Sequence, residues 1–384
     1  MREERGEGRG ENAMARFLNN FRLFRAFVLS GFRDSPIFLL VCRLLLAFAL
    51  TVLVLPQSLS AQQDDAEKTA AKMVSPAAQR AIDRALAFLA SAQQDDGSLG
   101  SGSYRGNVAV SALAGMAFLA GGSTPGRGPY GQHVSRAVDY LLAKTQESGF
   151  IVAAESSSHG PMYGHGFAAM FLAECYGMSP RPELRDKLAK SVRLIVNTQN
   201  KEGGWRYMPK REDAADISVT VCEVMALRAA RNAGLHVPKE TIDRTIDYVK
   251  RSQNADGGFM YMASQGGESA LARSAAGVVA LYSAGVYRGP EITKGLNYLM
   301  GFLPQPGVTR RESYYFYGHY YAVQAMWQAG GQPWHRWYPA IRDELITRQR
   351  RDGSWMCPIS VEVATAMSAI ILQTPNNYLP IFQR

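Results

Sequence analysis

Five copies of one short signal recur at nearly even spacing along this chain of 384 residues. In each copy a stretch with helical periodicity ends in Gln, and a polar or acidic turn then leads to Gly and an aromatic or apolar residue. A repeat of about 50 residues is typical of architectures in which every unit buries its apolar face against its neighbours. The copies are Gln93–Leu99, Gln199–Trp205, Gln253–Phe259, Gln349–Trp355 and a shorter one at Gln146–Phe150.

Two kinds of helix are predicted to alternate around these turns. The helix before each turn is amphipathic, with apolar residues such as Ile82, Leu86 and Leu89 at helical spacing. The helix after each turn is apolar nearly all round, and most of these helices end at a Gly that can adopt the left-handed cap. The amphipathic helices are predicted at Ala77–Ser91, Gln132–Lys144, Glu183–Asn197, Lys239–Ser252, Glu291–Phe302 and Tyr338–Arg348, and the apolar ones at Val108–Leu119, His165–Tyr176, Ser218–Ala230, Ala270–Ser283, Gly318–Gln328 and Glu362–Leu372.

Helices that are polar on one face belong outside and helices apolar all round belong inside, so the alternation predicts an all-α fold. The expected form is a six-hairpin α/α toroid of about twelve helices, a single domain over residues 77–384. An open solenoid is the alternative, but it usually needs atypical terminal repeats, and the last helix pair here is as apolar as the middle ones. Closure predicts that Val108–Leu119 and Glu362–Leu372 are neighbours.

Residues 1–61 fall outside the repeat. A basic flank precedes an apolar run, and its uncharged part, Leu44–Leu55, is shorter than the roughly 20 residues of a spanning helix. With the small residues Ser58 and Ser60, this pattern predicts a signal peptide cleaved near Ala61 and a protein exported to the periplasm or the extracellular space. An uncleaved N-terminal anchor, which would be the chain's sole contact with a membrane, is the alternative. Residues 62–76 are predicted to be a polar tether.

The charge and the cysteines exclude two other classes of protein. The net charge is +9, but the basic and acidic residues interleave along the helices, as in Arg181–Lys187. This is the pattern of a solvated helical face, and it argues against a nucleic-acid partner. Of the four cysteines, Cys42 lies in the leader, and the remaining three are too few and too scattered for a disulfide framework. Cys175 and Cys222 are predicted to be small buried hydrophobes.

The repeat resembles the QW repeat of squalene cyclases, also known as the prenyltransferase and squalene oxidase repeat. The resemblance covers roughly residues 77–380 and implies the α/α toroid superfamily of terpenoid cyclases and protein prenyltransferases. It also implies that the Gln and the aromatic residue of each turn staple neighbouring helices, so Trp205 and Trp355 are expected to be structural. The matching segments include Arg84-Ala85 with Phe88-Leu89 and Gln93, Arg136-Ala137 with Tyr140-Leu141 and Gln146, and Arg244 with Tyr248-Val249 and Gln253.

Squalene–hopene cyclases carry an Asp-x-Asp-Asp-Thr-Ala motif before an inner helix, and its middle Asp protonates the substrate. The counterpart here begins at Asp213. One alignment puts Ala215 at the donor position, and the other puts Asp216 there without its acidic neighbours. Asp216 is also predicted to be a helix N-cap, whose amides would lower its pKa. Those cyclases enclose the substrate between two rings, whereas this chain supplies one.

Metal chemistry is not expected. Protein prenyltransferase β-subunits resemble this chain in having one ring, but their zinc is held by Asp, Cys and His, and their Asp-x-Cys pair is absent here. Asp216 and Cys222 would lie about 9 Å apart along a helix and about 120° around it. The sequence therefore predicts neither a metal nor another cofactor. The Cys-Gly-Glu-Gln of complement-type thioester domains is missing too.

Aromatic residues crowd the start of the fifth inner helix, and such walls suit an apolar polyene or a passing cation. Three functions stay open. The broken catalytic motifs favour the first, binding of an isoprenoid-like apolar ligand or of a protein partner. The second is a terpenoid cyclase or prenyltransferase-type enzyme with Asp216 as acid, and the third is a glycosidase or lyase that uses carboxylates such as Glu155, Asp216, Glu268 and Glu362. Closure would bring one set of side chains to a mainly apolar pocket at the inner-helix N-termini. The predicted lining is Tyr163, His165, Asp216, Thr220, Tyr317, His319 and Tyr320.

Overall fold

The computed structural model describes residues 70–383, except 180 and 309–311. The predicted signal peptide or anchor, residues 1–61, lies outside the described residues, as does most of the predicted tether. The described residues belong to one compact unit, Ala66–Arg384. Within them the structure has twelve α-helices and no strand, which confirms the predicted fold class. No helix of this part of the chain is long and apolar enough to cross a membrane.

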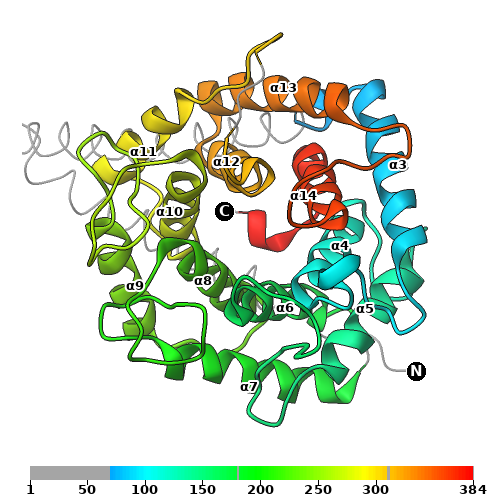
Figure 1. Ribbon diagram of the computed structural model, residues 1–384, viewed down its shortest axis with the longest axis horizontal. Coiled ribbons are helices and arrows are strands. Elements are labelled where there is room, and N and C mark those ends of the chain that lie inside the picture. Colours follow the sequence, from blue (N-terminus) through cyan, green and yellow to red (C-terminus); the bar gives the residue numbers. More distant parts are fainter. Residues whose placement is uncertain (1–69, 180, 309–311, 384) are drawn as a thin grey trace, which may run out of the picture. The chain divides into compact units, whose positions relative to one another are not determined.

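Helices of an outer and an inner ring alternate along the chain (Figure 1). The inner helices are nearly all apolar: in α4 every residue except Ala109 is buried. The outer helix α9, in contrast, buries only four residues on one face. The outer ring consists of α3 (Pro76–Ala92), α5 (Gly131–Ala143), α7 (Pro182–Thr198), α9 (Lys239–Arg251), α11 (Pro290–Met300) and α13 (Gly331–Arg348), and the inner ring of α4 (Val108–Ala120), α6 (Pro161–Tyr176), α8 (Ile217–Asn232), α10 (Leu271–Ser283), α12 (Tyr315–Ala329) and α14 (Val361–Gln373).

The ring is closed between its first and last repeats. Helix α14 packs against both α3 and α4, and α13 packs against α3. The predicted contact between the first and last inner helices is therefore confirmed. The side chain of Gln349, in the last turn, also donates a hydrogen bond to the carbonyl oxygen of Ala81 in the first outer helix, at 2.8 Å.

Four of the Gln turns fasten one outer helix to the next through the side-chain amide of their Gln. The amide nitrogen of Gln199 donates to the carbonyl oxygen of Gly203 at 2.9 Å and to that of Thr241 in the following outer helix at 2.9 Å. Gly203 has a φ of +99°, a conformation that side chains other than Gly rarely adopt. The buried indole of Trp205 donates to the carbonyl oxygen of Ile195 at 2.8 Å. The role of Trp205 is therefore structural: it holds the Gln turn against the preceding outer helix.

Most helices begin and end within a few residues of the predicted positions, but the predicted start of α13 is wrong. Helix α13 begins at Gly331 and not at Tyr338, so that Pro339 lies inside the helix and not in its first turn. Burial of Trp334 and Trp337 compensates for the hydrogen bond that this proline removes. Helices α6 and α12 start about one turn before the predicted residues, at Pro161 and Tyr315.

The chain ends with a short tail that lies at the C-terminal ends of the inner helices. It contains two 3-10 turns, η3 (Thr374–Asn376) and η4 (Pro380–Phe382), and η4 contacts α8 and α12. In Figure 1 the tail lies near the middle of the ring. The two ends of the ring therefore differ: loops surround the N-terminal ends of the inner helices, and the tail covers part of the other end.

Candidate functional site

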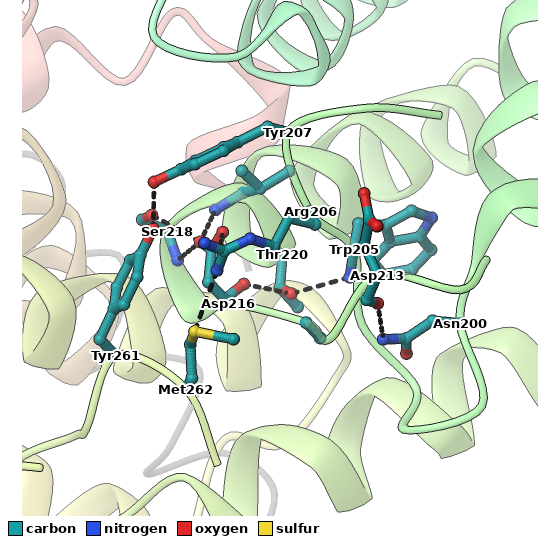
Figure 2. Close-up of polar contacts among 12 residues, drawn as sticks. Asn200, Trp205, Arg206, Tyr207, Asp213, Asp216, Ser218, Thr220, Tyr261 and Met262 are labelled. Atoms are coloured by element: carbon teal, nitrogen blue, oxygen red, sulfur yellow. Dashed lines mark hydrogen bonds and ion pairs between the residues drawn. The ribbon is translucent and has the colours of Figure 1, made fainter. Parts of the chain in front are cut away.

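Asp216 lies at the N-terminus of the inner helix α8 and is completely buried. Its Oδ1 accepts hydrogen bonds from the backbone amides of Ser218 and Val219, both at 2.9 Å, and from the Ser218 hydroxyl at 2.6 Å (Figure 2). The structure confirms the predicted N-cap. One carboxylate oxygen is thus fully engaged in capping the helix.

The second oxygen of this carboxyl group, Oδ2, is buried and has no hydrogen-bond partner among the described residues. The closest cation is Nη1 of Arg206, at 3.6 Å. Burial raises the pKa of Asp216 above its usual value, and the capping bonds and Arg206 offset this only in part. The capping bonds do lower this pKa, as expected, but desolvation is the larger effect, so the net shift is upward.

Arg206 stands between the carboxyl group and a pair of tyrosines. Its guanidinium lies 4.6 Å from the ring centre of Tyr207 and 5.6 Å from that of Tyr261. The hydroxyls of these two tyrosines are hydrogen-bonded to each other, and Arg206 also donates to the sulfur of Met262 at 3.0 Å (Figure 2). Oδ2 of Asp216, which accepts no hydrogen bond from the described residues, is thus flanked by a cation and by aromatic faces, a setting that can hold a polar group.

Three inner helices meet at Ser218, two residues after the cap. The hydroxyl of Tyr163, from α6, is hydrogen-bonded to the Ser218 hydroxyl. Tyr317, from α12, donates to the Ser218 carbonyl oxygen at 2.8 Å. Tyr163, Ser218 and Tyr317 are only half-buried, so they face space that solvent reaches. We call Tyr163, Arg206, Asp216, Ser218 and Tyr317 the α8 cluster.

Three of the seven predicted pocket residues, Tyr163, Asp216 and Tyr317, thus come together at one place. Thr220 is one helical turn further on, and its hydroxyl donates to the Asp216 carbonyl oxygen at 2.6 Å and accepts from the Trp205 amide at 3.2 Å. This arrangement ties the Gln turn to α8. The contacts of Thr220 are with the turn and not with the tyrosines of the cluster.

The two predicted histidines have separate surroundings. His165 is fully buried, accepts from the Ile151 amide at 3.1 Å and faces the Ser191 carbonyl oxygen at 3.3 Å. Burial lowers its pKa to about 4. His319 stacks on Tyr315 at 4.4 Å between ring centres, and burial lowers its pKa to about 3. Both imidazoles are therefore neutral at pH 7 and packed in the protein interior.

Tyr320 is buried against Phe167, with 6.3 Å between ring centres, and against Tyr321. Tyr321 in turn lies 3.3 Å from the sulfur of Cys222, which is one helical turn beyond Ser218. This layer of rings lies beneath the α8 cluster. Cys175 and Cys222 are both buried free thiols, as predicted.

The carboxylates considered for a glycosidase each have their own surroundings. Glu155 forms an ion pair with Lys144, and Glu268 is exposed. Ser360 caps the start of α14, and Glu362 in the first turn of that helix accepts from the Ser101 hydroxyl at 3.1 Å. Within the described ranges there is no group of three or more His, Cys, Asp or Glu residues that could hold a metal ion.

Sequence reasoning did not select Arg206 or Ser218 for the site. Arg206 follows the Trp of a Gln turn, and Ser218 is the second residue of a helix, which are both ordinary positions for polar residues. Each becomes part of a site because the ring brings the turns after α7 and α9 and the starts of α6 and α12 together.

Comparison with known families gives two matches along the ring. Residues 70–205 match the prenyltransferase alpha-alpha toroid domain, and residues 167–315 match the squalene-hopene cyclase C-terminal domain. Comparison with curated proteins gave no match. The ring therefore has the α/α toroid fold, and the two matched segments are similar to domains of prenyltransferases and of squalene-hopene cyclases.

Solved structures show the same fold at low sequence identity. The type II terpene cyclase MstE from Scytonema is 15% identical, with a TM-score of 0.54 over 79% of this chain and 100% of that one. A protein from Actinoplanes is 15% identical, with a TM-score of 0.56 over 78% and 99%. An alpha-1,6-mannanase from Salegentibacter is 7% identical, with a TM-score of 0.56 over 77% and 98%.

The comparison with MstE corrects the argument from chain length. On the sequence alone, the single ring weighs against a cyclase, because squalene–hopene cyclases enclose their substrate between two rings. The whole of MstE, a type II terpene cyclase, matches 79% of this chain. A single ring is therefore no reason to exclude the cyclase class.

Proposed function

We propose that this toroid binds an isoprenoid-like, mainly apolar ligand within the ring and holds its polar end at the α8 cluster. The observation that carries the proposal is that Oδ2 of Asp216 is buried without a hydrogen-bond partner among the described residues, beside the guanidinium of Arg206. A buried polar atom without a partner is costly, and a ligand hydroxyl could supply the missing hydrogen bond.

The aromatic side chains around the cluster fit the apolar part of such a ligand. Tyr163 and Tyr207 lie with their ring centres 6.0 Å apart, and Tyr317 stacks edge-on against Tyr321 at 4.8 Å. These half-buried and buried rings come from inner helices and from a Gln turn. MstE, which shares the fold, has been solved with geranylgeranyl dihydroxybenzoate as substrate, and that supports an isoprenoid-like ligand here.

A second function, acid catalysis, is favoured by the protonation of Asp216. Its raised pKa increases the fraction that carries a proton, and the capping bonds to Oδ1 leave Oδ2 as the oxygen that bears it. Transfer of that proton to an alkene carbon would form a C–H bond from the π electrons and leave a carbocation. The carboxylate left behind would be stabilised by the two capping amides and by Arg206.

Asp216→Asn separates binding from catalysis. Asn caps a helix nearly as well as Asp, so this variant should lose about 1 kcal/mol or less of unfolding free energy. Asp213→Asn is the matched control, because it makes the same change of charge three residues away in the same segment. For a binding protein, lipid retained through purification and identified by mass spectrometry should be reduced but not lost in Asp216→Asn, because the side-chain amide can still form a hydrogen bond to a ligand hydroxyl. It should be unchanged in Asp213→Asn. For an acid catalyst, only Asp216→Asn should abolish turnover of that lipid.

Binding itself is tested with farnesol as a probe and Arg206→Gln as the variant. We expect farnesol to quench the fluorescence of the aromatic residues in the wild type, with an affinity reduced several-fold in Arg206→Gln. If the wild-type protein retains no lipid and binds no farnesol, the proposal fails, and docking of a protein partner becomes the better account of the ring.

We also propose that the protein is exported. The support is the basic flank, the short apolar run and the small residues before Ala61. N-terminal sequencing should find the mature protein beginning near Ala61 outside the cytoplasm. A soluble cytoplasmic pool that still carries residues 20–50 would contradict this proposal.

A further inference from the structure

A cavity of about 460 Å³ lies at the end of the ring opposite to the α8 cluster. One wall is formed by Gly121–Thr124, directly after α4, and another by Glu174 and Met178 at the end of α6. The third wall is Tyr378–Pro380 from the C-terminal tail. The volume falls within the range of about 300–1,000 Å³ that is usual for small-molecule sites.

Glu174 is a buried carboxyl group in this cavity, with a side chain that is only 7% exposed. Its Oε2 accepts one long hydrogen bond, 3.4 Å, from the Ile381 amide of the tail. Its Oε1 has no hydrogen-bond or ion-pair partner among the residues that the structure describes. Burial raises the pKa of Glu174 to about 7. When Glu174 is ionised, no cation among the described residues forms an ion pair with it.

The residues around Glu174 do not supply that cation. No Lys, Arg or His lies among the described residues that line the cavity. The cavity also lies where α4 and α6 end, and the carbonyl ends of helices carry partial negative charge. Both features favour a positively charged ligand over a neutral or an anionic one.

The mouth of the cavity is apolar. Tyr378 and Met178 are 60% and 43% exposed, which is unusual for large apolar side chains, and both line the cavity. The ring of Tyr378 is held over Gly122, where an added Cβ would lie 3.2 Å from it. An aromatic face in this position can also attract an organic cation.

We propose that this cavity binds a small organic ammonium ion, with its charged nitrogen at Glu174 and its apolar group against Met178 and Tyr378. The site is independent of the α8 cluster, because α8 alone has 16 residues and so separates the two ends of the ring by about 20 Å.

The test compares hexylammonium with hexan-1-ol, which has the same apolar chain without the charge. At about pH 8 an alkylamine is still protonated, and Glu174, with a pKa of about 7, is mostly ionised. Calorimetric titration should show that the wild type binds hexylammonium at least tenfold more tightly than hexan-1-ol. Glu174→Gln should remove this preference, and the surface variant Glu183→Gln should keep it.

Tyr378→Ala provides a second variant in case Glu174→Gln fails to fold, because Tyr378 is largely exposed. It should weaken the binding of both probes several-fold. Equal binding of the two probes by the wild type would overturn the proposal, as would a charge preference that survives in Glu174→Gln. Binding of farnesol at the α8 cluster should be unaffected by both variants, so the two proposals can fail separately.

Discussion

Gly353, in the last Gln turn, lies against the first outer helix at the junction that closes the ring. Gly353 has a φ of +89°, and a Cβ added to it would lie 2.5 Å from the carbonyl oxygen of Arg84 in α3. That distance is too short for any real contact, and the clashing atom belongs to a helical backbone, so a change of rotamer cannot relieve it. Gly353→Ala therefore tests how tightly the ring is closed.

The magnitude follows from two contributions. The left-handed conformation costs an alanine about 1–2 kcal/mol, and forcing a methyl group into a packed contact costs about 1–3 kcal/mol more. The matched control is Gly234→Ala. Gly234 has nearly the same φ, +86°, but an added Cβ would meet no atom within 4 Å. Gly234→Ala should therefore show the conformational cost alone.

The assay is urea-induced unfolding followed by circular dichroism. We expect Gly353→Ala to lose about 2–5 kcal/mol of unfolding free energy and Gly234→Ala to lose about 1–2 kcal/mol. The difference between the two variants measures the packing of the last turn on the first outer helix. If both variants lose the same amount, the reasoning is refuted, because the junction then relaxes around a methyl group without cost.

Three further predictions concern buried polar groups. Glu174 binds its proton more tightly in the folded state (pKa about 7) than in the unfolded state. The unfolding free energy of the wild type should therefore fall relative to that of Glu174→Gln as the pH rises from about 4.5 to 7, by up to about 3 kcal/mol. His165 has the opposite sign: its pKa is lowered to about 4, so its contribution is lost as the pH falls below about 6.5, and its ring signals in NMR should not titrate above about pH 5. Trp205→Phe leaves the Ile195 carbonyl oxygen without its indole donor and should cost about 1–3 kcal/mol in urea unfolding, whereas a loss below a few tenths would contradict the stapling role.

The fold could be predicted from the sequence because each repeat carries its own local signals. Helical periodicity, an all-apolar inner helix and a Gly in each turn act over a few residues, and they agree with one another from Gln93 to Trp355. The start of α13 could not be predicted in this way. Pro339 is a local signal against a helix, and the packing of Trp334 and Trp337 that overrides it depends on the finished ring.

The site could be predicted only in part. Asp216 was found because a cap is a local pattern, and Tyr163 and Tyr317 because closure points their helices at one space. The role of Ser218 depends on which inner helices are adjacent, and the direction of the pKa shift of Asp216 depends on how completely the ring buries it. The cavity around Glu174 could not be predicted either, because its walls come from three distant segments of the chain.

The parallel inner helices give the two ends of the ring opposite electrostatic character. Tyr163 and Tyr317 join the starts of α6 and α12 to that of α8, and Gln373 at the end of α14 donates to Ala117 near the end of α4, at 3.1 Å. The partial positive charges of the helix N-termini therefore gather at the α8 cluster and the partial negative charges at the opposite end. The first end suits the carboxylate that Asp216 would become after giving up a proton. The second end opposes ionisation of Glu174 unless a cation is bound, so the same arrangement that builds the ring also determines which charge each end can accept.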